Sequence, residues 1–298
     1  MSLIELTRAP IDTAFPLLES TPDDRYFDYC LQPYQPRRPP AGRLRSENLL
    51  WHSLQVAGCL DRLSPPLLAM QAALGRDMTV WGVKFDGKKL WWETYVYDPL
   101  KEDPAATATE LAKTLSPWID HFPRISETIP YMMVSFDWTE RVLEERTIPA
   151  INLYLTGTEL HEGRSYRVTA TTRELDNIYR FYEAKRESTR VLSLLKSSVF
   201  VDYSDRPTLS KILVPELFAC KRICVAKKRT CDAIYYSGID VDRLLWFLKR
   251  FEYPQEIQDF IRSRYERFEH LYFDVGIDYS MNEHNEIVFH KTSYYGTL

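Results

Sequence analysis

The sequence predicts an α+β fold, a ten-stranded antiparallel β-barrel built from repeated helix-helix-hairpin units with the helices on the outside. Three observations lead to this prediction. Five pairs of neighbouring segments alternate apolar and polar residues with the period of a β-strand. Most of these pairs are separated by segments in which apolar residues are spaced three and four positions apart, as in helices. The unit recurs along the chain, and closing ten amphipathic strands into a barrel removes the exposed edges of the sheet.

The composition limits the classes of protein to consider. A chain of 298 residues with 45% hydrophobic residues is long enough to bury a large core. A net charge of -4 gives no whole-chain attraction to nucleic acid or to an anionic membrane. Because the chain has no run of about 18 apolar residues and no basic-then-apolar leader, we expect a cytoplasmic, monomeric protein. Five cysteines without zinc spacing argue against both a disulfide framework and a metal site.

Residues 1–45 form a proline-rich N-terminal segment, which precedes a single domain over residues 46–298. Seven prolines in this segment exclude a long regular helix. Residues 36–40 read Pro-Arg-Arg-Pro-Pro, and Arg43 and Arg45 follow. Two interpretations remain open, namely a solvated extended segment, or a flap or docking arm for an acidic partner.

The first unit begins at Ser46, a helix-capping residue. Apolar residues at positions 49, 50, 54, 56 and 60 predict a helix. The prolines at 65 and 66 are expected to end it and to restart a second helix over residues 67–74. The dipeptide Asp86-Gly87 between residues 78–85 and 88–97 then predicts the first hairpin.

The second to fourth hairpins follow in the same way. Residues 104–121 are predicted to be helical, with a restart at Ser116-Pro117, before a hairpin of residues 131–138 and 150–156 joined by a charged loop. The third hairpin pairs 165–171 with 177–182, and helices over 186–199 and 208–218 come next. The fourth hairpin pairs 222–227 with 233–236.

The last unit contains a helix from residue 241, a break at Tyr253-Pro254, a second helix to residue 269 and a hairpin of residues 270–278 and 286–295. One face of each hairpin is apolar, whereas the other is polar and rich in tyrosine. If helices cover the apolar face, the tyrosine-rich face lines the lumen. Ten strands make a lumen wide enough to hold a ligand.

Two segments of the chain resemble a known family. Residues 235–254, Tyr-Tyr-Ser-Gly-Ile-Asp-Val-Asp-Arg-Leu-Leu-Trp-Phe-Leu-Lys-Arg-Phe-Glu-Tyr-Pro, are similar to the strand, Ser-Gly, helix and proline linker of the soluble aromatic prenyltransferases. Residues 150–157, Ala-Ile-Asn-Leu-Tyr-Leu-Thr-Gly, are similar to a strand that ends a repeat in that family. This is the ABBA family, which includes the cyanobactin-type enzymes that prenylate peptides. As an architecture, the resemblance covers residues 46–298.

The resemblance implies an enzyme, a prenyltransferase. It would transfer an isoprenyl group from an allylic diphosphate, dimethylallyl or geranyl, to an electron-rich aromatic small molecule or peptide side chain inside the barrel. Cations would hold the leaving diphosphate, flat aromatic faces would surround the carbocation, and a carboxylate would accept the proton. No covalent cofactor is implied, and the use of Mg²⁺ stays open.

The resemblance also selects residues. In the family a basic residue often stands two positions before a tyrosine on a strand, and Arg180 before Tyr182 matches this pattern. Cations expected at the diphosphate are Lys84, Arg167, Arg180, Arg222 and Lys291. Tyrosines expected to shield the carbocation are Tyr95, Tyr154, Tyr182, Tyr235 and Tyr295. Glu93 is the first choice of proton acceptor and Asp274 the second. Replacing Arg180 with alanine is expected to weaken diphosphate binding.

Two alternatives remain at this stage. One is a non-catalytic binding or scaffold protein with an aromatic-lined cavity, and the other is an open sheet without a lumen. Inward-facing bases that converge at one depth would favour the enzyme, whereas a lumen filled by apolar side chains would favour the scaffold. The chain has no glycine-rich phosphate loop, no Gly-x-Ser-x-Gly elbow and no His-Glu-x-x-His motif.

Overall fold

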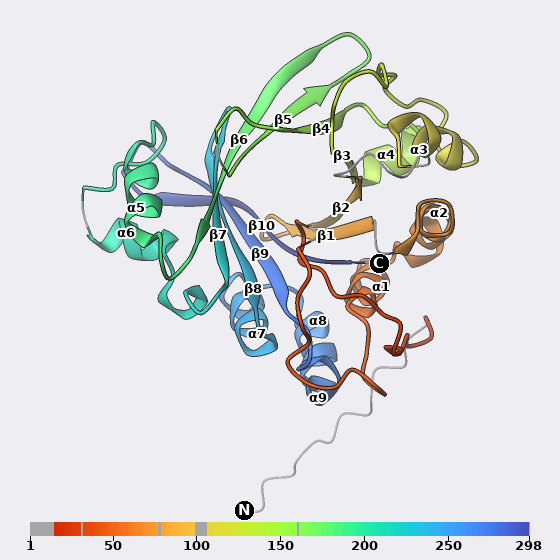
Figure 1. Cartoon of the computed structure of the whole chain (residues 1–298), viewed down its shortest axis with the longest axis horizontal. Helices are drawn as coiled ribbons and strands as arrows, with labels where there is room; N and C mark the ends of the chain where they lie inside the picture. Colours follow the sequence, from red (N-terminus) through yellow and green to blue (C-terminus); the bar gives the residue numbers. More distant parts are fainter. Residues whose placement is uncertain are drawn as a thin grey trace, which may run out of the picture.

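Ten antiparallel strands form a closed barrel in the computed structural model, which describes residues 15–30, 32–76, 79–98, 106–159, 161–204 and 206–297 (Figure 1). Each strand pairs with its sequence neighbours, and β10 pairs with β1 to close the barrel. The strands are β1 Thr79–Phe85, β2 Leu90–Tyr97, β3 Met133–Trp138, β4 Ile151–Thr156, β5 Glu162–Val168, β6 Arg173–Glu183, β7 Arg222–Lys228, β8 Asp232–Ile239, β9 Phe273–Met281 and β10 Ile287–Thr297. The predicted α+β barrel is therefore confirmed, and the open-sheet alternative is wrong.

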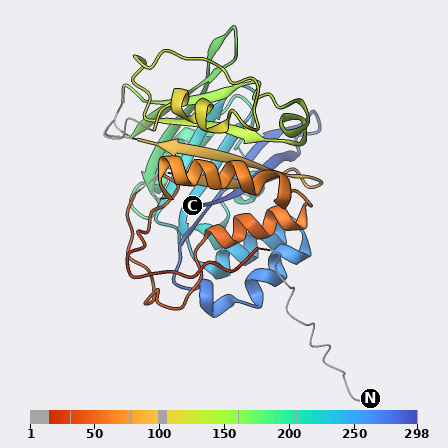
Figure 2. The same ribbon diagram turned by 90° about the vertical axis from the view of Figure 1, so that its right-hand side faces the viewer.

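Helices connect the hairpins. They are α1 Glu47–Val56, α2 Leu60–Leu74, α3 Ala108–Leu115, α4 Glu140–Glu145, α5 Ser188–Lys196, α6 Arg206–Ile212, α7 Val241–Arg250, α8 Gln255–Arg262 and α9 Tyr265–Phe268. Figure 2 shows α1 and α8 near each other, and the rings of His52 and Phe260 stack between them at 4.0 Å. Among the described residues, no helix has both the length and the apolar character needed to cross a membrane.

Three local predictions for the helices are wrong. The break after α1 falls at Gly58, which has a φ of 67°, and α2 continues through Pro65 and Pro66. Glycine adopts a positive φ without steric cost, so it ends the helix before the prolines are reached. The helix α3 ends at Leu115 and does not restart. The charged loop of the second hairpin contains α4, because the Thr139 side chain caps it by accepting the Val142 N–H at 3.3 Å.

The strands present two differently packed faces. The larger apolar cluster combines helix side chains with alternate residues of the strands, such as Val225 and Ile234. The smaller cluster contains the other strand parity: Val80, Tyr95, Tyr97, Met133, Tyr154, Cys224, Ala226, Ala233, Tyr235 and Tyr295. The tyrosine-rich face is therefore buried as a unit, separate from the core that contains the helices.

The N-terminal segment, where it is described, packs against the rest of the chain. Arg37 contacts Asp240 at 3.3 Å and Arg43 contacts Glu269 at 3.0 Å. Arg37, Arg38 and Pro39 are nevertheless exposed, so this part is a solvated segment that ion pairs attach to the rest of the chain.

Residues 26–30 and 32–34 of this segment form a tight turn, which we name the N-terminal hairpin. The Asp28 N–H donates to the Gln32 carbonyl at 3.0 Å, and the Tyr34 N–H donates to the Tyr26 carbonyl at 2.9 Å. In Figure 1 the segment is coloured red and crosses one end of the barrel. The tip residues Tyr29 and Cys30 line the cavity inside the barrel.

Candidate functional site

Five tyrosines form a closed ring of contacts in the lumen. One comes from each even-numbered strand, and neighbouring ring centroids are 5.9 to 6.4 Å apart. The members are Tyr95, Tyr154, Tyr179, Tyr235 and Tyr295. We name this set the tyrosine ring. Because its members touch around the full circumference, they divide the lumen into two parts along the barrel axis.

Two glycines make room for the tyrosine ring. A Cβ atom on Gly276 would lie 2.6 Å from the ring of Tyr235, and one on Gly82 would lie 2.7 Å from the ring of Tyr295. Such distances are shorter than any ordinary carbon contact. The two lumen-facing glycines are therefore needed for the aromatic packing.

The tyrosine hydroxyls face the end of the barrel where the strands turn in hairpins. Three of them bond to the side chain two positions earlier on the same strand, which lies on the same side of the sheet. These pairs are Tyr95 with Glu93 at 2.5 Å, Tyr179 with Asn177 at 3.0 Å and Tyr295 with Ser293 at 2.7 Å. A polar layer therefore lies directly beyond the tyrosine ring.

Three lysines, of which Lys84 is buried and Lys228 and Lys291 are half-buried, and three carboxylates make up the charged part of this layer, which we name the charged floor. The Lys84 ammonium group contacts Glu93 at 2.5 Å and Asp137 at 2.6 Å. One carboxylate oxygen of Asp278 lies 2.7 Å from the ammonium nitrogen of Lys228 and 3.4 Å from that of Lys291. Three bases from three strands thus lie in this layer, and each is paired with a carboxylate.

The floor perturbs the titration of its own members. Burial opposes the ionisation of Glu93, but Lys84 and Lys291 outweigh it and lower the pKa of Glu93 to about 2. Burial lowers the pKa of Lys291 to about 8, against the attraction of Asp278. Because Lys291 shares its carboxylate with Lys228, it is the lysine that a new anion would stabilise most.

A cavity of about 520 Å³ lies on the other side of the tyrosine ring. All five ring tyrosines line it, together with Tyr97 and Phe181, which stand two positions further along β2 and β6. His161, Glu187 and Arg222 are also among its lining residues. The order along the axis is therefore charged floor, tyrosine ring, cavity and N-terminal hairpin.

Asp274 lies at the end of the lumen next to the N-terminal hairpin, away from the charged floor. It accepts the N–H of Tyr29 at 2.9 Å and the N–H of Gly238 at 2.9 Å. Gly238 has a φ of 78° at a bulge in β8, which directs its N–H to the carboxylate. Burial and the nearby Asp28 charge raise the pKa of Asp274 to about 7.

The structure brings together most of the residues selected from the sequence. Lys84 and Lys291 lie in the charged floor, and Glu93 lies there with them. Four of the five selected tyrosines, namely Tyr95, Tyr154, Tyr235 and Tyr295, belong to the tyrosine ring. Asp274 faces the lumen from its other end, next to the N-terminal hairpin.

The predicted lumen position of Arg180 is wrong, and Tyr182 lies outside the tyrosine ring. Arg180 pairs with Glu159 at 2.6 Å and with Glu162 at 2.7 Å. Tyr182 packs against the larger, helix-containing cluster and also borders the cavity of about 520 Å³. The cause is a bulge at Asp176, where the pairing of β5 with β6 shifts by one residue. Beyond this bulge the odd-numbered residues of β6 face the lumen.

The other two predicted cations do not reach the floor. Arg167 is exposed, on a strand position opposite Asn152. Arg222 lines the cavity, and its nearest acidic partner is Asp28 at 3.8 Å. Strand parity alone could not show how deep in the barrel each of these side chains would lie.

Several residues of the site were not selected from the sequence. Lys228 lies just beyond the strand predicted over residues 222–227, but it alternates with Cys224 and Ala226 along β7 and could have been found by parity. Asp278 stands four positions after Asp274 on β9, so strand parity places both side chains on the same face. Tyr29 is different, because no periodicity of the N-terminal segment indicates that its ring enters the barrel.

Fold and site together define a closed antiparallel barrel whose lumen combines a charged floor with a tyrosine-lined cavity. A scan of the chain against models of protein families found no match, and a search of curated proteins found no significant match. The function is therefore argued from the site.

Proposed function

We propose that this protein is a prenyltransferase that transfers an isoprenyl group from an allylic diphosphate to an electron-rich aromatic or peptide side-chain acceptor in the cavity. The observation that carries this proposal is the order of layers in the lumen. Three lysines of the charged floor lie on one side of the tyrosine ring, and a cavity of about 520 Å³ lies on the other. The resemblance to the ABBA prenyltransferases, with paired helices around the barrel, is part of the same proposal.

Each layer suits one part of the reaction. The diphosphate would bind at Lys84, Lys228 and Lys291, which stabilise the negative charge that it gains when it leaves with the electron pair of the C–O bond. The allylic cation would lie within the tyrosine ring, whose π faces stabilise positive charge and whose burial excludes water. The acceptor in the cavity would then form the new bond to carbon.

The acceptor's proton also has a path. Tyr95 lines the cavity and donates its hydroxyl hydrogen to Glu93 at 2.5 Å. With a pKa of about 2, Glu93 is a weak base while Lys84 contacts it. If Lys84 turns toward a bound diphosphate, Glu93 loses a cation and its pKa rises. Glu93 would then accept a proton through Tyr95.

The charge balance of the floor leads to an expectation about Mg²⁺. Since three lysines face three carboxylates, the floor has no excess positive charge for a diphosphate. Mg²⁺ commonly binds through one or two carboxylates plus substrate phosphates, and Asp137, which Lys84 would release when it turns toward the diphosphate, offers one such group. Among the described residues, no cluster of three or more acidic, histidine or cysteine side chains could hold a metal alone. Bound Mg²⁺ would neutralise part of the diphosphate charge.

The test is calorimetric titration with a non-hydrolysable thio analogue of dimethylallyl diphosphate, with and without Mg²⁺. We expect micromolar affinity that is stronger with Mg²⁺. Lys228→Gln is expected to raise the Kd at least about tenfold, because it removes a charge-assisted contact. Arg180→Gln is the matched control, since Arg180 faces away from the lumen, and its Kd should equal that of the wild type.

Absence of binding, repeated with a geranyl analogue, would refute the enzyme proposal. It would support the second candidate, a binding or scaffold protein whose cavity holds an aromatic ligand. The pairing of every floor lysine with a carboxylate favours this candidate, because such a floor is electrostatically satisfied without any diphosphate. An equal loss of affinity in Lys228→Gln and Arg180→Gln would also count against the assigned site.

A further inference from the structure

The N-terminal hairpin occupies part of the barrel lumen through its tip residue Tyr29. The Tyr29 ring stacks on Tyr295 at 5.2 Å and on Tyr235 at 5.9 Å, both of them members of the tyrosine ring. Its N–H donates to Asp274 at 2.9 Å, and its carbonyl accepts the hydroxyl of Tyr97. The peptide unit at the tip is thus held by lumen side chains, as a bound ligand would be.

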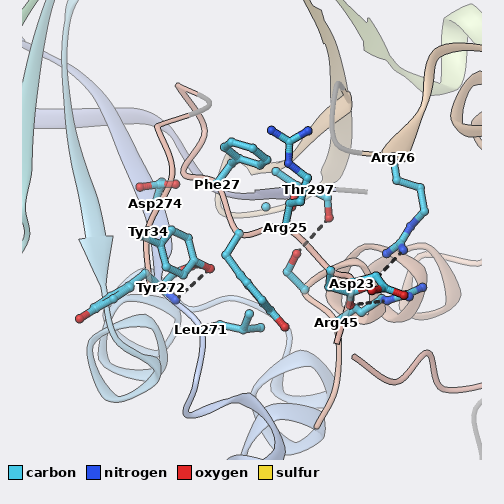
Figure 3. A pocket seen from close by; sticks show the side chains of 14 residues that line it. Asp23, Arg25, Phe27, Tyr34, Arg45, Arg76, Leu271, Tyr272, Asp274 and Thr297 are labelled. Carbon is cyan, nitrogen blue, oxygen red and sulfur yellow. Dashed lines mark hydrogen bonds and ion pairs between the residues drawn. The ribbon is translucent and has the colours of Figure 1, made fainter. Parts of the chain in front are cut away.

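Three cavities adjoin this hairpin. One of about 280 Å³ separates Tyr26 and Phe27 from Leu271 and Asp274 of the barrel. Figure 3 shows this cavity, with Tyr34, Tyr272 and Asp274 on one side and Arg45 and Arg76 on the other. A second cavity, of about 240 Å³, lies between Asp28 and Tyr34 on one side and Arg222 on the other. The third is the cavity of about 520 Å³, which the tip residues Tyr29 and Cys30 line. These cavities interrupt the packing between the hairpin and the barrel, so local opening of the hairpin needs only the contacts between the cavities to break, such as Tyr29 with Tyr235 and Tyr34 with Tyr272.

Two carboxyl groups face each other where the hairpin meets the barrel. Asp274 accepts the Tyr29 N–H, and the neighbouring Asp28 lies 3.4 Å from the Ser237 hydroxyl, on the strand next to Asp274. Burial raises the pKa of both carboxyl groups, and repulsion by the Asp28 charge raises the pKa of Asp274 further. The Arg222 guanidinium group lies 3.8 Å from Asp28, so it offsets only part of this repulsion. The contact that fixes the tip is therefore electrostatically weakened.

We propose that the N-terminal hairpin is a displaceable plug of the barrel: its Tyr29 ring fills the ligand subsite between Tyr235 and Tyr295 and must leave before a ligand can take that subsite. Displacement of the Tyr29 ring does not depend on prenyl transfer. A closed plug keeps the cavity lined on this side by protein, and an open plug joins the three cavities into one entrance.

The chain contains a reporter for this motion, because Cys30 lies at the tip of the hairpin and lines the cavity. The test measures the rate at which iodoacetamide alkylates each cysteine of the full chain under native conditions, resolved by peptide mass mapping. Cys220, which is 2% exposed and belongs to the core, reports global unfolding. Because Cys30 is already half-buried with the plug closed, we expect it to react at least about tenfold faster than Cys220, at a rate that low concentrations of urea do not change, and a further increase on removal of the Tyr29 ring reports the opening.

Tyr29→Ala removes the ring that fills the subsite. It is expected to raise the Cys30 rate at least about tenfold further, since a buried aromatic contact is lost. Tyr166→Ala is the matched control, because Tyr166 is a half-buried tyrosine on the other face of β5. The control should leave the ratio of the Cys30 rate to the Cys220 rate unchanged.

Two results would overturn the proposal. One is that Cys30 and Cys220 of the wild type react together, at a rate that rises with urea as global unfolding does. This result needs no variant, so it decides the question even if Tyr29→Ala does not fold. The other is that Tyr29→Ala and Tyr166→Ala change the Cys30 rate equally. Because neither measurement uses a diphosphate, both are independent of the proposed function.

Discussion

Two lumen carboxylates, Glu93 and Asp274, differ in their ionisation because their partners differ. Glu93 contacts the ammonium group of Lys84, and its pKa is about 2. Asp274 is bonded to two backbone N–H groups and faces the charge of Asp28, and its pKa is about 7. Glu93 is therefore ionised throughout the physiological range, whereas Asp274 exchanges its proton near neutrality. A pair of carboxyl groups with separated pKa values is a common feature of sites that move protons.

Asp274→Asn is expected to remove a pH dependence of stability. The pKa of Asp274 is raised in the folded state, so the folded protein binds more protons than the unfolded chain between about pH 4 and pH 7. Its contribution to the free energy of unfolding is present at acidic pH and is lost as the pH rises to about 7. Urea unfolding across this window should show a smaller decrease in the variant than in the wild type. An exposed control, Asp61→Asn, should keep the wild-type decrease, and an unchanged slope in Asp274→Asn would contradict the assignment.

Glu93→Gln is expected to destabilise the protein by about 3–5 kcal/mol, because it leaves the buried Lys84 with a weaker set of partners. The remaining partner, Asp137, has a side chain that is 39% exposed and screened by water. The measurement is the free energy of unfolding in urea at neutral pH. The control is Glu110→Gln, which breaks the exposed pair with Lys113 and should cost less than about 1 kcal/mol. Equal losses in the two variants would show that Glu93 is not a buried ion-pair partner.

At the scale of the elements, a single bulge decides which side chains of β6 belong to the site. Glu174 is opposite Arg167, and Asn177 is opposite Ser165, so Asp176 is the extra residue. A bulge of one residue reverses the parity of the strand beyond it. Tyr179 therefore enters the tyrosine ring, whereas Arg180 faces outward.

Gly276→Ala should disturb the tyrosine ring. The new methyl group would lie 2.6 Å from the Tyr235 ring and 2.9 Å from the Ser293 hydroxyl, so the ring must move at a cost of about 1–3 kcal/mol. The measurements are the melting temperature and near-ultraviolet circular dichroism, which reports tyrosine packing. Gly163→Ala is the control on β5, because its nearest neighbour would be Phe181 at an ordinary 3.6 Å. If the control perturbs both signals as strongly, steric contact with Tyr235 is not the cause.

At the scale of the whole molecule, closure of the barrel makes the layered lumen possible. The pairing of β1 with β10 leaves the sheet without an edge and encloses the tyrosine ring on all sides. The first and last strands thereby bring Lys84 close enough to Lys291 for its charge to lower the pKa of Lys291.

Closure predicts the pattern of amide hydrogen exchange. Paired on both sides, β1 and β10 should exchange as slowly as β8 and β9, because all four strands open only when the barrel does. Mass spectrometry of peptic fragments measures this. Residues 173–175, at the exposed start of β6, serve as the fast reference. Exchange in β1 and β10 that approaches this reference, while β8 and β9 stay protected, would show that the barrel is open at that seam.

Much of the fold follows from local patterns. The dipeptide Asp86-Gly87 and the alternation of residues along each strand predict the five hairpins, and the spacing of apolar residues predicts α7 and α8. Parity also places Lys84, Glu93 and the tyrosines of β2, β4, β8 and β10 on the lumen face. Helix ends were harder to predict because they depend on single residues, such as Gly58 and Thr139.

What the sequence determined by itself is the amphipathic character of each hairpin, because a period of two is a property of the strand and needs no partner. Only the tertiary structure decided the parity of β6 beyond Asp176, the pairing of each floor lysine with its carboxylate, and the insertion of Tyr29 into the barrel. These features depend on contacts between distant parts of the chain. Tyr29 and Asp274 are 245 positions apart, and their hydrogen bond exists only once the barrel has closed around it.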